Sequence, residues 1–587
     1  MKLRATCSLL ALIAATAPAW LLPPRASAQA QAQAQTPAPS AAPARTPAAV
    51  PARTLPPVLP PSQIDGPLAA TWPTYNGDYS GRRYSTLRLV DKTNVSHLTL
   101  AWTARVDTHE PEAGHAPDAA STTVGGEGTG GFPIGNVAIR GAVLQVDGIL
   151  YITSTDHAWA VDGRDGHELW HYFWNTRGGT HIGNRGAALW NSSLLFETPD
   201  DYLVSLDART GHENWHVQIA SLDEDYFSTM APVVVGDHVL VGTGNDSDSP
   251  GFLQSYDPRT GKLQWRRYMV PMTADDPALK TWPSLDAARH GGGNTWTAGA
   301  YDPQTGYYIT GTGNPTPSYT GVARPGDNLY TCSLVAVKVD TGEIAWHYQT
   351  SPHDTHDWDS AQTPILIDGE IDGKPRKLVA TAARNGYFFV LDRVTGKHLV
   401  TSKFGSTVNW ARGLRPDGAP DADPAKSATV PGSLVSPTEG GVTNYQPNAF
   451  NPDTGLFYTH ENTAYQLLYL TDPDPRGSMG LGGKRFAIVG AAGNGFEAID
   501  YRTGKITWRH EWPGRGGAGT GVLTTATGLV FTGDTNGNLV AMDAGNGAFL
   551  WHTRIGNISN TPETYLIDGR QYLLVAVGDT LYSFVLY

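Results

Sequence analysis

Short stretches in which apolar and polar residues alternate dominate this chain. Examples are VLQVDGILYITS (143–154), VVVGDHVLVGT (233–243) and GLVFTGDTNGNLVAMD (528–543), each interrupted by Gly, Asp or Asn. Alternation with a period of two predicts β-strands, and the interrupting residues predict tight turns between them. Amphipathic helical periodicity is scarce. The pattern therefore predicts an all-β protein built from strand–turn–strand units.

A longer pattern recurs along the chain: an Asp, then a Gly four residues later, then a Trp after four more. The full copies are AVDGRDGHELW (160–170), SLDARTGHENW (205–215), SYDPRTGKLQW (255–265), AIDYRTGKITW (498–508) and AMDAGNGAFLW (541–551); AVKVDTGEIAW (336–346) has Lys338 in place of the Asp. Intervals of roughly 36–59 residues match one multi-stranded blade per repeat, with the Trp packed between neighbouring sheets. We expect an eight-bladed β-propeller with tryptophan-docking repeats, closed by pairing of 572–587 with a strand near 70–103.

The first 63 residues differ from the rest in composition. Lys2 and Arg4, an apolar run and the small residues Ala26-Ser27-Ala28 predict a secretory signal peptide over 1–28. Residues 29–63 are rich in Ala, Pro and Gln, which predicts a disordered linker before a propeller over 64–587. We therefore expect export to the periplasm and no transmembrane segment.

Charge and cysteine content exclude two classes of function. The 587-residue chain has a formal net charge of −13, which argues against nucleic-acid binding, because phosphate contacts need clustered Lys and Arg. The two cysteines are Cys7 and Cys332, and no Cys-x-x-Cys-His haem attachment motif occurs, so the sequence predicts no c-type haem of its own. The sequence leaves open whether the protein forms a homodimer.

The densest chemistry lies in SPHDTHDWDS (351–360), with three carboxylates and two imidazoles between His353 and Asp359. By itself this segment fits a solvated turn, a metal site or an acid–base centre. Its neighbours are GGGNTWTAGAYDPQTGYYITGTGNPTP (291–317), RPGDNLYT (324–331) and ARNGYFFVLDR (383–393). In this order and spacing the motifs resemble the quinoprotein alcohol dehydrogenases, exported eight-bladed propellers that use pyrroloquinoline quinone (PQQ) and a metal ion.

The resemblance implies roles for the central residues. PQQ is a planar tricarboxylate, which needs an aromatic floor, cationic donors and a hard cation at its reactive carbonyl. Trp296 matches the stacking indole, Asn314 a metal-ligand amide, Asp357 the catalytic base and Arg384 the cation beside the quinone oxygens. Further cofactor contacts are implied for Arg185, Thr229, Thr243 and Asn409.

The resemblance leaves the metal open between Ca²⁺ and a lanthanide. Asp246 matches a position where relatives usually have Glu, with Asp248 as an alternative ligand in the same turn. Asp359, two residues after the base, is similar to an additional carboxylate of the lanthanide-dependent branch, and trivalent ions demand more anionic oxygen. His353 and His356 are not expected as ligands, because hard cations prefer oxygen; His356 is placed to face substrate.

Two departures from the family leave the substrate open. Relatives often have adjacent cysteines near PQQ, where this chain has Gly179 and Thr180, and Arg140 lies near a position that often carries Glu. The resemblance implies an alcohol substrate and transfer of electrons to a separate acceptor, a soluble cytochrome c. A PQQ sugar or polyol dehydrogenase and a cofactor-free periplasmic propeller scaffold are the alternatives.

Overall fold

The computed structural model describes residues 64, 68–106, 138–174, 176, 184–244, 249–360, 362–470, 484–512 and 520–587. The chain divides after Thr54, and all of these residues belong to the second unit, Leu55–Tyr587. The described residues are almost entirely strands and turns, with a single α-helix, α1 (Leu285–Arg289). Short 3₁₀ helices lie at Val95–His97, Leu222–Glu224, Pro277–Thr281 and Pro424–Lys426. None of the described helices is long and apolar enough to span a membrane.

Four sheets in the first half of the described chain each contain four consecutive antiparallel strands. They are β3 (Leu144–Val146), β4 (Ile149–Ser154), β5 (His157–Asp162) and β6 (Glu168–Phe173); β7 (Ala187–Trp190), β8 (Ser193–Glu197), β9 (Tyr202–Asp207) and β10 (Glu213–Gln218); β11 (Val233–Val235), β12 (His238–Gly242), β13 (Phe252–Tyr256) and β14 (Leu263–Tyr268); β15 (Ala300–Asp302), β16 (Tyr307–Gly311), β17 (Ser333–Lys338) and β18 (Ile344–Gln349).

The second half adds four sheets of four or five strands and one two-stranded sheet. They are β19 (Ile365–Ile371), β20 (Lys374–Ala382), β21 (Tyr387–Asp392) and β22 (His398–Lys403); the pair β23 (Ala411–Leu414) and β24 (Pro420–Ala422); β25 (Ser433–Val435), β26 (Ala449–Asn451), β27 (Leu456–Leu470), β28 (Lys484–Asp500) and β29 (Ile506–Trp512); β1 (Tyr84–Ser85), β30 (Leu523–Thr525), β31 (Leu529–Gly533), β32 (Asn538–Asp543) and β33 (Phe549–Arg554); β2 (Leu98–Arg105), β34 (Glu563–Ile567), β35 (Arg570–Val577) and β36 (Thr580–Leu586).

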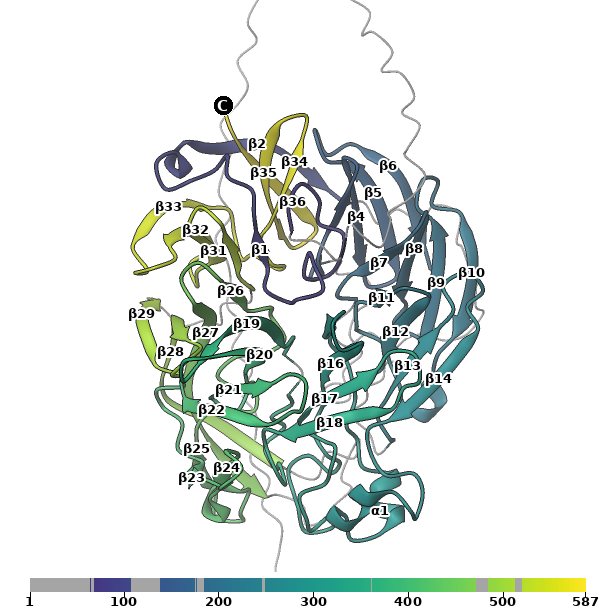
Figure 1. Cartoon of the computed structure of the whole chain (residues 1–587), viewed down its shortest axis with the longest axis vertical. Helices are drawn as coiled ribbons and strands as arrows, with labels where there is room; N and C mark the ends of the chain where they lie inside the picture. The colour runs from purple at the N-terminus through teal and green to yellow at the C-terminus, as the bar shows by residue number, and fades with distance from the viewer. Residues whose placement is uncertain are drawn as a thin grey trace, which may run out of the picture. The chain divides into compact units, whose positions relative to one another are not determined.

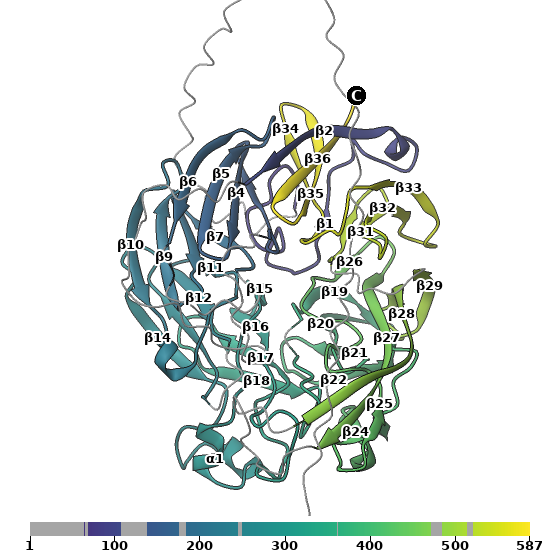
Figure 2. The ribbon, with the colours of Figure 1, turned by 180° about the vertical axis from the view of Figure 1, so that it is seen from behind.

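Within this unit the sheets follow one another around a common centre in chain order, and both views show the same succession (Figures 1 and 2). The last sheet joins the two ends of the described chain, because β36 pairs antiparallel with β2 from Leu98↔Leu586 to Arg105↔Thr580. This confirms the pairing that the C-terminal segment predicts. Apolar side chains fill the space between successive sheets, as where Leu195 and Leu203 pack with Val234 and Val241.

The repeat residues make a recurring contact between neighbouring sheets. The indole of Trp170 on β6 donates to the carbonyl oxygen of Ala208, which follows β9 in the next sheet, at 3.0 Å. A Cβ on Gly211, which has φ +73°, would lie 2.7 Å from that indole, so only glycine fits this turn. The same indole-to-carbonyl bond joins Trp265 to Val339, Trp346 to Arg393 and Trp508 to Ala544.

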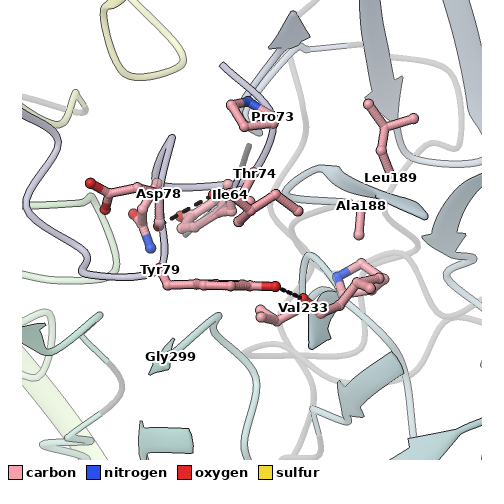
Figure 3. Close-up of a pocket in the computed structure, with 13 residues that line it drawn as sticks. Ile64, Pro73, Thr74, Asp78, Tyr79, Ala188, Leu189, Val233 and Gly299 are labelled. Atoms are coloured by element: carbon pink, nitrogen blue, oxygen red, sulfur yellow. Dashed lines mark hydrogen bonds between the residues drawn. The ribbon is translucent and has the colours of Figure 1, made fainter. Parts of the chain in front are cut away.

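The segment before β1 crosses the centre and contacts several sheets. Trp72 forms a backbone bridge with Gln145, and the buried Arg83 donates to the carbonyl oxygens of Val522 and Pro562. Tyr79 donates its hydroxyl to the carbonyl oxygen of Val234 at 2.7 Å, beside a cavity of about 20 Å³ (Figure 3). That volume holds about one water molecule. This segment therefore links several of the sheets.

Candidate active site

The residues singled out from the sequence lie at the ends of strands in two neighbouring sheets. Trp296 precedes β15, Asn314 follows β16, Asp357 and Asp359 follow β18, and Arg384 follows β20. Strand ends that face the same way around a common centre bring loops distant in sequence together. The strands thus position the site, and the loops next to them supply its side chains.

Asp359 contacts three other residues of this group. Its Oδ2 accepts hydrogen bonds from the indole nitrogen of Trp296 at 2.8 Å and from Nη1 of Arg384 at 2.9 Å. Its Oδ1 accepts from the backbone N–H of Asn314 at 2.6 Å. Gly313 lies beside the same carboxylate, since a Cβ there would be in ordinary contact with Oδ1 of Asp359, at 3.5 Å. One buried carboxylate therefore fixes the indole, the amide segment and the cation relative to one another.

Arg384 connects the two carboxylates of the loop. Its Nη2 donates to Oδ2 of Asp357 at 3.3 Å and to the carbonyl oxygen of Glu439 at 2.6 Å, while Nη1 bonds Asp359. Burial by itself lowers the pKa of Arg384, but the charges of Asp357 and Asp359 outweigh it and raise that pKa above its usual value. The cation is therefore permanent, and it is shared between two anions.

Asp354 organises the loop that carries Asp357. Its Oδ2 accepts from the backbone N–H groups of His356, Asp357 and Trp358, at 3.1, 2.8 and 3.1 Å. Three N–H groups converging on one carboxylate hold a tight turn, in which Asp357 has φ +65°. Asp354 therefore stabilises the turn. The three carboxylates of this loop have different roles.

The two imidazoles of the loop bond backbone carbonyls. His353 Nδ1 lies 2.7 Å from the carbonyl oxygen of Gly326. His356 Nε2 lies 2.8 Å from the carbonyl oxygen of Lys426, and its ring stacks on Trp358 with centroids 4.1 Å apart. Burial lowers the pKa of both rings. Both imidazoles hold the loop in place.

Arg185 lies over the ring of Trp296. Its guanidinium carbon is 4.6 Å from the centre of the Trp296 ring and 4.4 Å from that of Tyr445, and Nη1 donates to the carbonyl oxygen of Thr229. Arg185 is 1% exposed, and burial lowers its pKa. Its Nε and Nη2 are buried without a hydrogen-bond partner among the described residues. Such orphaned donors are costly, so they indicate a missing acceptor.

The remaining predicted contacts are less direct. Thr229 Oγ1 donates to the carbonyl oxygen of Trp296, and Thr243 Oγ1 donates to Oδ1 of Asn294, each at 3.4 Å. Asn409 bonds the backbone of β25 and the residue after it: Nδ2 donates to Leu434 and Oδ1 accepts from Ser436. The structure does not join Asn409 to the group around Asp359. Four residues fall outside the described ranges: Asp246, Asp248, Gly179 and Thr180.

Three further residues at the site were not predicted from the sequence. Tyr445 lies against Arg185, Glu439 bonds Arg384 through its carbonyl oxygen, and the hydroxyl of Tyr319 donates to Oε2 of Glu439 at 3.1 Å. The sequence feature that could have drawn attention to this segment is Gly440-Gly441, which lies between polar residues. Gly441 has φ +81°, and a Cβ there would meet the backbone oxygen of Arg384 at 2.8 Å.

The donor set fits a planar, polyanionic cofactor. Arg185 offers two unpartnered nitrogens beside the Trp296 ring, and Nε of Arg384 is likewise buried without a partner among the described residues. For a hard cation, the side-chain amide nitrogen of Asn314 donates to the carbonyl oxygen of Pro315 and to Oγ of Ser318, so its amide oxygen takes none of these contacts. No cluster of three His, Cys, Asp or Glu that could hold a metal occurs within the described ranges.

Comparison with known families and proteins agrees with this donor set. The PQQ family described as "Glucose/ethanol/alcohol dehydrogenase, beta-propeller domain" matches residues 72–403, which include Trp296, Asn314, Asp357, Asp359 and Arg384. A second family, "Outer membrane protein assembly factor BamB", matches 476–584. The predicted all-β, propeller-type fold is thereby confirmed.

Several relatives match over most of their length. The quinoprotein alcohol dehydrogenase PedH of Pseudomonas putida is 34% identical over 542 residues, covering 85% of this chain and 84% of that protein. The quinohemoprotein alcohol dehydrogenase of Comamonas testosteroni is 33% identical over 549 residues, covering 86% of this chain and 72% of that protein.

Solved structures agree with these relatives. Quinohemoprotein alcohol dehydrogenase ADHIIG from Pseudomonas putida superimposes with a TM-score of 0.79 at 28% identity, over 91% of this chain and 83% of that one. A europium-containing methanol dehydrogenase gives 0.76 at 26% identity, over 89% and 99%. Fold, donor set and sequence thus converge, and the chain belongs to the PQQ-dependent quinoprotein alcohol dehydrogenases.

Proposed function

We propose that this protein is an exported, PQQ- and metal-dependent dehydrogenase that oxidises an alcohol with Asp357 as general base. The observation that carries the proposal is the shared cation: Arg384 bonds Asp357 and Asp359 at once, and Asp359 also bonds Trp296 and Asn314. A structural ion pair would not need an indole and an amide on the same carboxylate. The arrangement supports a base, a cofactor floor and a cation site in one place.

The reaction requires removal of a hydroxyl proton as hydride leaves the alcohol carbon. When bound, PQQ supplies the hydride acceptor, and the metal ion polarises its carbonyl. Asp357 takes the proton, because its carboxylate is one-quarter exposed while its neighbours are buried. Arg384 holds that carboxylate in place and stabilises the negative charge that develops beside it.

We assign the metal to Asp246, Asn314, Asp357 and Asp359. Three carboxylates and an amide oxygen suit Ca²⁺ or a lanthanide, which prefer oxygen ligands. The likeness to a europium-containing methanol dehydrogenase supports the lanthanide. Trp296, Arg185, Thr229 and Thr243 would hold PQQ, with Arg384 at its reactive edge.

We further propose that the eight large sheets are eight propeller blades docked by their tryptophans. A signal peptide over 1–28 and a linker over 29–63 would precede this propeller, and electrons would pass to a separate soluble cytochrome c in the periplasm. The sequence has no Cys-x-x-Cys-His motif for a haem of its own. The family assignment rests on 72–403, which contains Asp357, Asp359 and Arg384, so it replaces the scaffold alternative suggested by repeats alone.

The proposal is tested with Asp357→Asn. Protein reconstituted with PQQ and either Ca²⁺ or La³⁺ should oxidise alcohols in a dye-linked assay, and Asp357→Asn should lower kcat by at least about a thousandfold without loss of PQQ. Asp372→Asn is the matched control, because Asp372 is an exposed aspartate that also has positive φ (53°). No PQQ uptake by the wild type with either ion, or full activity of Asp357→Asn, would refute the assignment.

A further inference from the structure

An open cleft of about 560 Å³ lies beside β13 and β14, and α1 contributes to its lining. The segment after β10 and the residues before β13 form much of the rest of its described walls. Clefts of about 300–1,000 Å³ are typical sites for small organic ligands. None of the described lining residues belongs to the group around Asp359 or to the predicted PQQ contacts. The cleft is therefore space for a ligand that the proposed reaction does not use.

Arg266, on β14, lines this cleft with its guanidinium held along one edge. Nε and Nη2 both donate to Oε1 of Gln254, at 3.1 and 3.0 Å, and Nη2 also donates to the carbonyl oxygen of Ile219 at 3.2 Å. The guanidinium carbon lies 4.4 Å from the centre of the Phe252 ring. Among the described residues, Nη1 has only a 3.5 Å contact with Oη of Tyr268. The guanidinium is thus fixed in place, and Nη1 can take a stronger acceptor.

Arg289, at the end of α1, repeats this arrangement. Its Nε and Nη2 both donate to the carbonyl oxygen of Met272, at 3.2 and 2.8 Å. No hydrogen bond of its Nη1 is found among the described residues. Arg289 and Arg266 line the same cleft from different elements. Two guanidinium groups, each fixed along one edge, therefore keep a donor for a ligand beside the same space.

Aromatic side chains form another part of the lining. The ring centres of Tyr226 and Phe252 are 5.2 Å apart, and those of Phe252 and Tyr268 are 5.7 Å apart with the planes at 80°. All three residues line the cleft, together with Ile219 and Met272. Such a wall favours a ligand with an aromatic body, because rings pack against one another edge to face or offset. An inorganic anion would leave this part of the cleft unfilled.

The charge of the lining favours an anion. Two arginines outnumber the single carboxylate, Glu224, among the described lining residues, although the whole chain has a net charge of −13. A carboxylate accepts charge-assisted hydrogen bonds from two guanidinium groups at once. We propose that this cleft binds a small aromatic carboxylate, whose anionic end is held by Arg266 and Arg289 and whose ring lies beside Tyr268. This inference goes beyond the proposed alcohol oxidation and does not depend on it.

The first test is a calorimetric titration with phenylacetate. The full chain is first loaded with one equivalent of PQQ and its metal ion, so that Arg185 is already occupied. Phenylacetate should then bind at one site. Phenylacetamide, its neutral counterpart, should bind at least about tenfold more weakly because it lacks the charge. Inorganic phosphate, an anion without a ring, should also bind at least about tenfold more weakly.

Variants of the two arginines locate the binding site. Arg289 is exposed, so Arg289→Ala should keep the Tm within about 2 °C of the wild type and weaken phenylacetate binding at least about tenfold. Arg266→Lys keeps the charge but loses the planar fork, and should weaken binding at least about threefold. Arg209→Ala is the matched control, because Nε and Nη2 of that exposed arginine also bond one residue, Asp207, which does not line the cleft.

The outcomes separate the cleft from the cofactor site. Phenylacetate binding that disappears on loading with PQQ and is unchanged in Arg289→Ala would place the carboxylate at Arg185 and overturn the inference. Absence of binding at millimolar phenylacetate, or equal affinities for phenylacetate and either phenylacetamide or phosphate, would also overturn it. Failure to take up PQQ would refute the proposed function alone, because Arg289→Ala and Arg209→Ala are then compared with the wild type without cofactor.

Discussion

At the scale of single residues, the guanidinium of Arg185 is held by two aromatic rings. Trp296 and Tyr445 both lie within 5 Å of it, at 4.6 and 4.4 Å, and their rings meet at 63°. Cation–π contacts stabilise the desolvated charge, while two of its nitrogens stay available for an acceptor. The two rings thus hold the guanidinium in place.

We expect Arg185→Lys to weaken PQQ binding about tenfold or more. Lysine loses the planar fork and the stacking surface, and charge-assisted hydrogen bonds contribute about 1.5–3 kcal/mol each. Fluorescence titration of the apoprotein with PQQ measures the change. Arg259→Lys is the control, because Arg259 makes the same contact with Trp190 at 5.1 Å on an exposed surface. Equal affinities in both variants would contradict a cofactor role for Arg185.

The sequence identified several of these residues but not how they divide the work. Trp296, Asn314, Asp357, Asp359 and Arg384 lie in contact, as the resemblance implied. Side chains that act by filling space or orienting a neighbour carry no spacing of their own in the sequence. Tyr445, Glu439 and Asp354 therefore became visible only through their contacts.

At the scale of elements, the sheet containing β27, β28 and β29 buries a carboxyl pair around one cation. Arg509 on β29 bonds Glu461 on β27 at 3.3 Å and Glu497 on β28 at 2.6 Å. Burial and the neighbouring Glu461 raise the pKa of Glu497 to about 9, against the opposing effect of Arg509. Glu497 is therefore protonated in the folded protein at neutral pH, and the sheet holds one cation against one anion.

This element predicts a pH dependence of stability. Between pH 4.5 and about 9 the folded protein retains a proton on Glu497 that the unfolded chain releases, so the free energy of unfolding falls as pH rises through this range. Glu497→Gln, a neutral isostere, should raise the Tm at pH 8–9 and flatten the decline between pH 6 and 9. Glu511→Gln, at an exposed position of the same sheet, should reproduce the wild-type curve. A parallel curve for Glu497→Gln would mean that Glu497 is ionised when folded.

The strands themselves follow directly from the sequence. Period-two alternation marked β4, β12 and β31, and the Asp–Gly spacing marked the turns after β5, β9 and β13. Such signals are local, because one strand and its turn need only nearby residues. The lengths of β27 (Leu456–Leu470) and β28 (Lys484–Asp500) are not marked by any repeat, since their extra residues pair with each other and with β25.

At the scale of the whole molecule, the ends of the described chain meet in one sheet. β2 and β36 are far apart in the sequence, and their pairing connects the last sheet to the first part of the described chain. Leu581 on β36 is fully buried among residues of the same sheet and of β4 and β5. Closure thus depends on β36, which pairs with β2 on one side and with β35 on the other.

Leu581→Ala should lower the free energy of unfolding by about 2–5 kcal/mol, the usual cost of truncating a buried leucine. Urea unfolding followed by tryptophan fluorescence measures this. Tyr587→Ala, at an 80% exposed position on the same C-terminal segment, should be neutral within about 0.5 kcal/mol. A neutral Leu581→Ala would show that the closing sheet contributes little to stability.

The sequence by itself determined the all-β architecture, the blade-like repeat, the pairing of its C-terminal strand and a central group of site residues. These depend on local periodicity, on turn chemistry and on motifs that keep their order along the chain. Only the tertiary structure decided that Asp354 and the two histidines hold the loop, that Asn409 bonds a distant backbone, and that the carbonyl oxygen of Glu439 shares Arg384 with Asp357. Those facts arise where loops from different sheets meet, and the distance between such loops is set by the packing of the sheets rather than by any neighbour in sequence.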